Sequence, residues 1–284
     1  MTAISSTGES IVVHPSQAPM PSVWRVGLSR GSVELKAFFR ERQAMVFIFA
    51  MPAVMLVLLG AIFGSEHAGD GVSIGDLYVA GLIGGGVMAT SYQNLGMSIA
   101  FERERFTLKR LRGTPMPPAA YFAGKFIQVV VAAIAEVVVL LTVGIAFYHL
   151  RLPTSLSAWW TFTWVFFLGV AACSLLGIAA SSLPRSAARN GVAVITLPFV
   201  VLQFISGVYV PFTLVPPWLR DIASVFPLEW MCRGMRSVFV PQAVALEPGH
   251  SWQLGQAALV LLAWAGAGLV LCLRTFRWQN RQDG

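Results

Sequence analysis

Long, nearly uncharged apolar runs alternate along the chain with short segments that hold most of its charges. Six runs reach the roughly 17–25 residues that an α-helix needs to cross a bilayer core of about 30 Å. These runs are Ala44–Phe63, Leu77–Ala100, Phe126–Phe147, Trp159–Leu183, Gly191–Tyr209 and Trp252–Leu273. The pattern predicts an all-α polytopic membrane protein, with a domain of six transmembrane helices over residues 44–273.

The segment before the first run, residues 22–43, mixes basic residues with apolar residues at helical spacing. Trp24 and Leu28, and again Leu35 and Phe39, are four residues apart and would share one face of a helix. This pattern predicts an amphipathic interfacial helix on the inner face of the membrane. A tethered tail is the alternative.

The segment between the fifth and sixth runs is apolar, yet its pieces are too short to span a bilayer. Helical patterns follow Pro216-Pro217 and Pro227; their apolar positions are Leu219, Ile222, Val225 and Phe226, then Trp230, Met235, Val238 and Phe239. The patterns predict short re-entrant or interfacial helices before the last span. Backbone that enters a membrane only partway must be buried in protein or line a cavity.

The basic residues predict the orientation of the six spans. Of the 20 Lys and Arg residues, only Arg151, Arg220, Arg233 and Arg236 lie on one side of the predicted membrane. Because basic segments are retained on the cytoplasmic side, both ends of the chain are predicted to be cytoplasmic. Residues 1–21 are expected to form a disordered tail, and residues 274–284 a cytoplasmic tail.

Composition and motifs exclude several functional classes. With 56% hydrophobic and 12% charged residues, the chain has about half the roughly 25% charge of a soluble domain. The net charge of +7 is spread over short loops, which disfavours nucleic-acid binding. No P-loop, zinc-protease or nucleophile-elbow motif occurs, and all four histidines lie outside the apolar runs. The three cysteines show no metal-ligand spacing, so no catalytic residue, metal site or cofactor is expected in this chain.

The loop between the second and third runs holds the most informative pattern. Residues Phe101–Arg112 are good helix formers, and Gly113 with the prolines that follow would end that helix. Glu102 and Arg105 are spaced as an i, i+3 pair, while Leu108 and Leu111 form a small apolar face. Spacing alone does not distinguish this charged helix from an ordinary cytoplasmic loop.

The order of residue types in this loop resembles a family signature. The residues that carry it are Glu104, Thr107, Leu108, Leu111, Thr114, Pro115, Gly124 and Lys125. The pattern is similar to that of bacterial ABC exporter permeases of the second exporter class, which include the daunorubicin-resistance permeases. The six-span layout and the order of Pro211, Pro216, Pro227, Glu229 and Arg236 are similar as well. One departure is Phe106, where the family usually has glycine, which leaves the local backbone turn open.

The resemblance implies a permease subunit in the bacterial inner (plasma) membrane that exports a drug, lipid or other amphipathic substrate. In that family the loop packs on a separate ATPase subunit, which binds ATP and magnesium, and two identical or homologous permeases act together. The residues expected to couple to the ATPase are Glu102, Glu104, Arg105, Thr107, Leu108, Leu111, Thr114 and Pro115. The alternatives are a polysaccharide exporter, an ion-coupled secondary transporter and a membrane enzyme.

Two further features lie inside the predicted spans. Glu136 is a carboxylate deep in the third span, where an insertion cost of roughly 2.5–3.5 kcal/mol requires it to face protein or water. It is either a substrate contact or proton-linked switch, or a protonated structural residue. Helix packing is expected at Gly81, Gly85, Gly169 and Gly177, since small residues let helices approach closely, within one protomer or at the seam between two.

Overall fold

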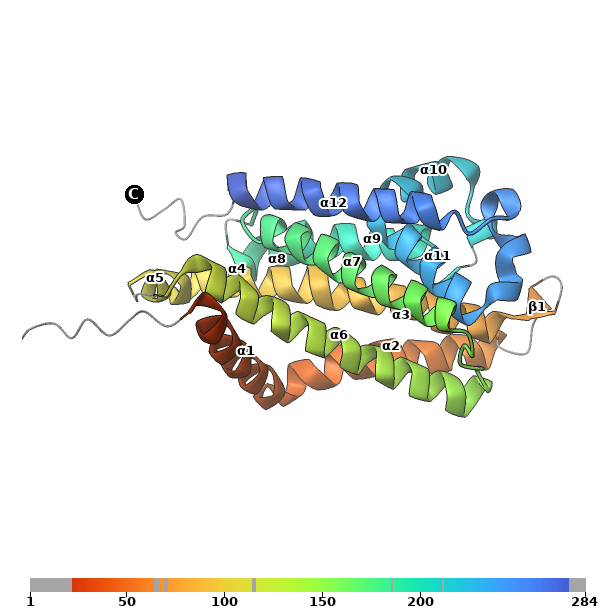
Figure 1. Ribbon diagram of the computed structural model, residues 1–284, viewed down its shortest axis with the longest axis horizontal. Coiled ribbons are helices and arrows are strands. Elements are labelled where there is room, and N and C mark those ends of the chain that lie inside the picture. Colours follow the sequence, from red (N-terminus) through yellow and green to blue (C-terminus); the bar gives the residue numbers. More distant parts are fainter. Residues whose placement is uncertain are drawn as a thin grey trace, which may run out of the picture.

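The computed structural model describes residues 22–63, 67–68, 71–113, 116–184, 186–210 and 212–275, and shows a bundle of helices along one long axis (Figure 1). Within this part of the chain, six helices are long and apolar enough to cross a membrane. Four are continuous: α2 (Arg42–Phe63), α6 (Pro118–Tyr148), α7 (Leu156–Ala180) and α12 (Leu254–Thr275). The predicted six-span, all-α architecture is therefore confirmed.

The second and fifth spans are each interrupted by a wide, π-helical turn that the apolar pattern did not predict. Span two consists of α3 (Ile74–Met88), η1 (Ala89–Asn94) and α4 (Leu95–Glu104). Span five consists of α8 (Ala187–Gly191), η2 (Val192–Thr196) and α9 (Leu197–Ile205). The two wide turns touch, because Gln93 Nε2 donates a hydrogen bond of 3.4 Å to Thr196 Oγ1.

Span two occupies the centre of the bundle. Of the 15 residues of α3, 13 are buried, whereas α2 exposes large side chains such as Phe47 along its length. The two ends of the bundle differ in the elements that they carry (Figure 1). At one end, here called the basic end, lie α1 (Val23–Arg40) and α5 (Thr107–Arg112). At the other, the hairpin end, strands β1 (His67–Ala68) and β2 (Val72–Ser73) pair.

Helix α1 packs across α6 at the basic end and runs steeply to the long axis of the bundle (Figure 1). Glycines permit this contact: a Cβ at Gly124 of α6 would lie 2.7 Å from Arg30 Cγ, and one at Gly27 3.1 Å from Ala123 Cβ. Small residues four apart commonly allow such approach between helices in membranes. Leu28 on α1 is 62% exposed. The amphipathic helix predicted over residues 22–43 is thus present as α1, with apolar surface left for lipid.

The segment before the last span folds into short helices, as predicted. Helix α10 (Pro217–Val225) and helix α11 (Pro227–Phe239) are separated by Phe226. In α11, 12 of 13 residues are buried, and the helix packs against α3, α7 and α12. Three 3₁₀ turns complete the hairpin end: η3 (Phe212–Leu214), η4 (Pro241–Leu246) and η5 (Pro248–His250). Helix α11 therefore enters the bundle partway and is covered by protein.

Four buried charged residues, here called the α11 cluster, hold this re-entrant helix; they are Glu229, Arg233, Arg236 and Glu247. Arg233 Nε donates to Glu229 Oε1 at 2.8 Å, and Arg236 Nε donates to Glu247 Oε1 at 2.6 Å. Arg236 Nη1 also donates to the Gly207 carbonyl oxygen at 3.3 Å. Burial raises the pKa of Glu229, although the two arginines beside it oppose that shift. Pairing within the cluster offsets the cost of burying four charges.

Candidate functional site

The segment between spans two and three is not the continuous helix predicted over Phe101–Arg112; that prediction is wrong. Helix α4 ends at Glu104, and α5 begins at Thr107 after a left-handed residue, Phe106, with φ 58° and ψ 15°. Left-handed backbone at an L-residue costs roughly 1–2 kcal/mol. The break turns α5 so that Leu108 is fully buried in the bundle core. Glycine, usual at this position in the resembling permeases, takes this conformation without that cost.

The exposed side of this break and of α5 carries three cations and one aromatic ring, here called the α5 surface: Arg105, Phe106, Lys109 and Arg110. Phe106 is 47% exposed, and Lys109 Nζ lies 5.9 Å from the centroid of its ring. Within the described ranges, none of these three cations forms an ion pair. Exposed arginine and aromatic side chains at a rigid position are typical of protein-binding surfaces.

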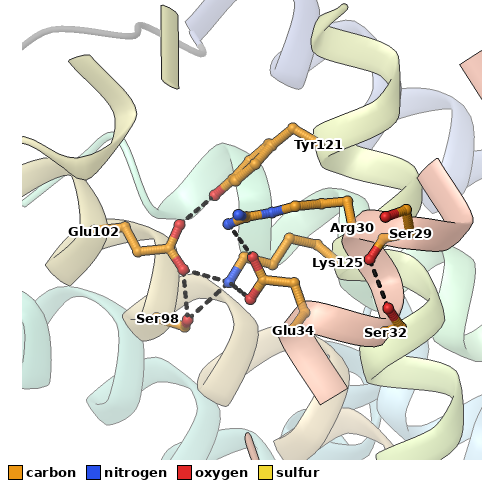
Figure 2. Close-up of polar contacts among 8 residues, drawn as sticks. All are labelled: Ser29, Arg30, Ser32, Glu34, Ser98, Glu102, Tyr121 and Lys125. Atoms are coloured by element: carbon orange, nitrogen blue, oxygen red, sulfur yellow. Dashed lines mark hydrogen bonds and ion pairs between the residues drawn. The ribbon is translucent and has the colours of Figure 1, made fainter. Parts of the chain in front are cut away.

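At the basic end of α4, an ion network joins three helices (Figure 2). Its charged members, here called the basic-end cluster, are Arg30 and Glu34 of α1, Glu102 of α4 and Lys125 of α6. Lys125 Nζ donates to Glu34 Oε2 at 2.8 Å and also pairs with Glu102, while Arg30 pairs with Glu34. Tyr121 donates its hydroxyl proton to Glu102 Oε2 at 2.8 Å. The Lys125 side chain is only 2% exposed.

The end of span two is also tied to spans four and five. Glu104 accepts hydrogen bonds from Ser186 Oγ at 2.7 Å and from the backbone N–H of Ala188 at 3.1 Å, at the start of α8. Arg103 donates to the carbonyl oxygen of Ser181, just after α7, and to its hydroxyl at 3.4 Å. A displacement of α4 would therefore change the ion pairs and hydrogen bonds that link it to α1, α6, α7 and α8.

The residues predicted to couple to an ATPase are thus divided among different environments. Glu102 and Glu104 make contacts inside the chain, Leu108 is buried, and Thr107 and Leu111 are half-buried. Arg105 is exposed with its guanidinium 5.8 Å from the ring of Phe101, so the i, i+3 ion pair predicted between Glu102 and Arg105 is not formed. Thr114 and Pro115 lie outside the described residues.

Sequence reasoning missed the contributions of Glu34, Phe106 and Ser186. Glu34 lies 91 residues from its partner Lys125, and no local spacing could have indicated that pairing. The signal that was present is a lysine at the mouth of a long apolar run, because a charge there requires a partner or access to water.

Glu136 faces the centre of the bundle. Its Oε2 accepts a hydrogen bond of 2.6 Å from Thr90 Oγ1 in η1, and its side chain leaves no room for a Cβ at Gly86. Oε1 has no hydrogen-bond partner within the described part of the chain. The carboxyl group therefore lies between spans two and three and faces protein.

Each of the four glycines predicted to pack helices lies at a close approach within this chain. A Cβ at Gly81 would lie 2.8 Å from the Val208 carbonyl oxygen, and one at Gly85 2.9 Å from Val208 Cγ1. Gly169 and Gly177 of α7 approach Met231 Cε and the Tyr92 carbonyl oxygen, at 2.8 and 2.6 Å. These contacts seat the segment after α9 against α3, and α11 and the wide turn η1 against α7.

Comparisons with known proteins agree with this arrangement. Residues 31–240 match the family model of the ABC-2 type transporter. The chain is also 25% identical over 147 residues to a protein called "Probable multidrug ABC transporter permease YbhR" in Escherichia coli strains K12 and O157:H7. That stretch is 52% of this chain and only 39% of each relative. Because the family match covers well over half of a chain with six spanning helices, this protein is an ABC transporter permease and belongs to the ABC-2 type transporter family.

Proposed function

We propose that this chain is the membrane-spanning subunit of an ATP-driven exporter, and that the α5 surface docks on a separate ATPase subunit. The observation that carries the proposal is the α5 surface itself: an exposed phenylalanine, and cations that form no ion pair with the described residues, at a break where the left-handed residue Phe106 ends span two. ATP and magnesium would be bound by the partner. The working unit would contain two permeases, identical or homologous, and two ATPases.

The charge distribution supports a cytoplasmic location for the basic end, in a bacterial inner membrane. Arg151, Arg220, Arg233 and Arg236 lie at the hairpin end, and two of these four are buried in the α11 cluster. Most of the other 16 basic residues flank the basic end. This asymmetry is the pattern that retains loops in the cytoplasm, where ATP is available.

The contacts of α4 and α5 supply a path by which a movement of the ATPase would reach the spans. A push on α5 would reach α4 directly, and α4 continues through η1 into the buried centre of the bundle. The same push would shift Glu102 relative to Lys125 and Glu34, and Glu104 relative to Ser186. Helices with alternative arrangements joined by such polar contacts are typical carriers of conformational coupling.

The cargo is proposed to be a drug or another amphipathic small molecule. The printed name of the Escherichia coli relatives, a probable multidrug permease, supports this class. The interior supports it as well, because an intramembrane cavity bounded by spans two, four, five and six is lined almost entirely by apolar side chains.

The test is co-purification from native membranes. A tagged Arg105→Glu/Lys109→Glu variant should lose a P-loop ATPase that the wild-type chain retains, because two attractive charges on the α5 surface become repulsive. Arg151→Glu is the matched control. It reverses the charge of an exposed side chain at the hairpin end and should retain the ATPase. If no P-loop ATPase accompanies the wild-type chain, or the double variant keeps it fully, the docking proposal is wrong.

A further inference from the structure

A cavity of about 250 Å³ lies in the membrane-spanning part of the bundle, between α7, α9 and α12, with the wide turn η1 contributing to its wall. Leu176 and Ala180 of α7, Phe199 and Leu202 of α9, and Trp264 of α12 line it. Towards the hairpin end it is bounded by Phe226, whose ring stacks on Trp264 with a centroid separation of 5.8 Å. Trp264 is fixed in turn by a hydrogen bond of 2.6 Å from its Nε1 to the Val225 carbonyl oxygen.

The side chains that line the cavity favour uncharged ligands. None of the described residues lining the cavity is charged, and nearly all are aliphatic, aromatic or proline. The exceptions are the hydroxyl groups of Tyr92 and, at the basic end, Thr275. Apolar walls with one or a few polar groups are typical of small-molecule sites, which have volumes of roughly 300–1,000 Å³. A charged or sugar-like ligand would lose its hydration here without compensation.

Tyr92 is the polar group best placed to orient a ligand. It belongs to η1, and its carbonyl oxygen packs against Gly177, where a Cβ would come within 2.6 Å. Its backbone is therefore held against α7. Its half-buried side chain lines the cavity, and its hydroxyl forms no hydrogen bond with another residue in the described part of the molecule. A phenolic hydroxyl can both donate to and accept from a ligand.

A second observation also indicates that this cavity is a functional site. Both wide turns of the bundle adjoin the cavity: η1 contributes Tyr92, and η2 is followed at once by α9, whose Pro198 and Phe199 line it. The Gln93–Thr196 hydrogen bond joins the two turns. Wide turns of this kind occur preferentially at functional sites. An occupant of the cavity would contact both interrupted spans at their interruptions.

We propose that this cavity binds an uncharged amphipathic small molecule, with its apolar body among the α7, α9 and α12 side chains and one hydrogen-bonding group at the Tyr92 hydroxyl. The proposal rests on the proposed export function in that such a molecule would be cargo of the exporter. The volume of about 250 Å³ suits a compound of a few fused or linked rings.

The experiment is a binding titration with the full-length protein, without any ATPase, in nanodiscs of phosphatidylethanolamine and phosphatidylglycerol. The probe is 1-aminoanthracene, an uncharged aromatic amine whose fluorescence rises in apolar surroundings. Saturable binding above that of empty nanodiscs is expected. Tyr92→Phe should raise the Kd about threefold to tenfold, the usual effect of losing one hydrogen bond.

A matched pair of variants separates the cavity from the lipid-facing surface. Leu202→Trp fills the cavity from α9 and should abolish saturable binding. Val201→Trp places the same bulk on the adjacent, 52% exposed position outside the cavity and should leave binding unchanged. The proposal would be overturned if binding were not saturable, if Leu202→Trp still bound the probe saturably, or if Tyr92→Phe left the Kd unchanged. It would also be overturned by a wild-type site that takes the probe only after tightly held lipid is stripped from it, since a lipid chain would then be the natural occupant.

The two proposals can fail separately. Saturable binding by a chain that recruits no ATPase would refute the export function and leave the cavity as a binding site. An ATPase that docks on the α5 surface of a chain with no saturable site would refute only the cavity.

Discussion

A buried cluster of charges lies near each end of the bundle, and the two clusters are built differently. The basic-end cluster joins side chains of α1, α4 and α6, and its ion pairs connect residues 91 and 23 positions apart. The α11 cluster lies mostly within one helix and the turns that follow it, with hydrogen bonds between residues 4 and 11 positions apart. One cluster therefore ties three long helices together, whereas the other ties α11 mainly to the turns beside it.

The difference also lies in how the charges are shared. Lys125 is the single ammonium that contacts both carboxylates of the basic-end cluster. In the α11 cluster Arg233 pairs with both Glu229 and Glu247, Arg236 pairs with Glu247, and Arg236 also bonds the Gly207 carbonyl oxygen. A movement of α1, α4 or α6 would change the distances from Lys125 to its two carboxylates, whereas the α11 cluster joins α11 mainly to the turns next to it. The basic-end cluster is therefore the better candidate for a moving part.

The largest effect in this comparison is expected for Lys125→Met. The substitution keeps the aliphatic volume but leaves Glu34 and Glu102 without their shared cation, and removing one partner of a buried ion pair typically costs about 3–5 kcal/mol. The thermal unfolding midpoint of the purified protein should fall sharply. Lys36→Met, at an exposed position of α1, is the control and should change the midpoint little. Equal midpoints for the two variants would contradict the proposed role of Lys125.

A smaller effect is expected for Glu247→Gln in the α11 cluster. Glu247 pairs with both arginines, but the amide can still accept a hydrogen bond from Arg236, and Arg233 keeps Glu229 while Arg236 keeps Gly207. The loss should therefore be about 1.5–3 kcal/mol, as for a charged hydrogen bond. The same thermal measurement applies. A loss equal to or above that of Lys125→Met would show that the α11 cluster also depends on one central charge.

The smallest effect concerns the left-handed residues at the two ends. Left-handed backbone at the hairpin end occurs at glycines such as Gly207, with φ +78°, and at three other residues, whereas within the described basic end it occurs at Phe106, with φ 58°. A β-branched residue tolerates this conformation poorly, so Phe106→Val should unfold more easily than Phe106→Gly by about 1–2 kcal/mol. Both variants lose the ring, which makes each the control for the other. Equal stabilities would mean that position 106 does not keep its left-handed backbone.

The sequence predicted the spans well because each span is specified by its own composition. A run such as Phe126–Phe147 is apolar at nearly every position, and its only charged residue, Glu136, accepts a hydrogen bond from Thr90 of η1. The helices after Pro216-Pro217 and Pro227 were equally predictable, since proline fixes the first turn of a helix. These features depend on neighbouring residues alone.

The sequence did not reveal features that depend on distant residues. Local propensity favours one helix through Phe106, yet the burial of Leu108 and the contacts of Glu102 with Lys125 place a break there. The wide turn η1 likewise carries no local signal, and its backbone packs directly against Gly177. Each of these outcomes is decided by tertiary packing, which overrides helix propensity.

The packing of α1 on α6 has a consequence for the order in which the molecule is built. A ribosome makes α1 first, but the helix that receives Gly27 and Gly31 starts at Pro118, after two complete spans. Until that third span has entered the bilayer, α1 lacks its main protein partner, and its apolar residues that later face α6 must rest on the lipid surface. Only one residue, Glu41, separates α1 from α2. The first span must therefore insert with α1 already lying at its final level in the membrane.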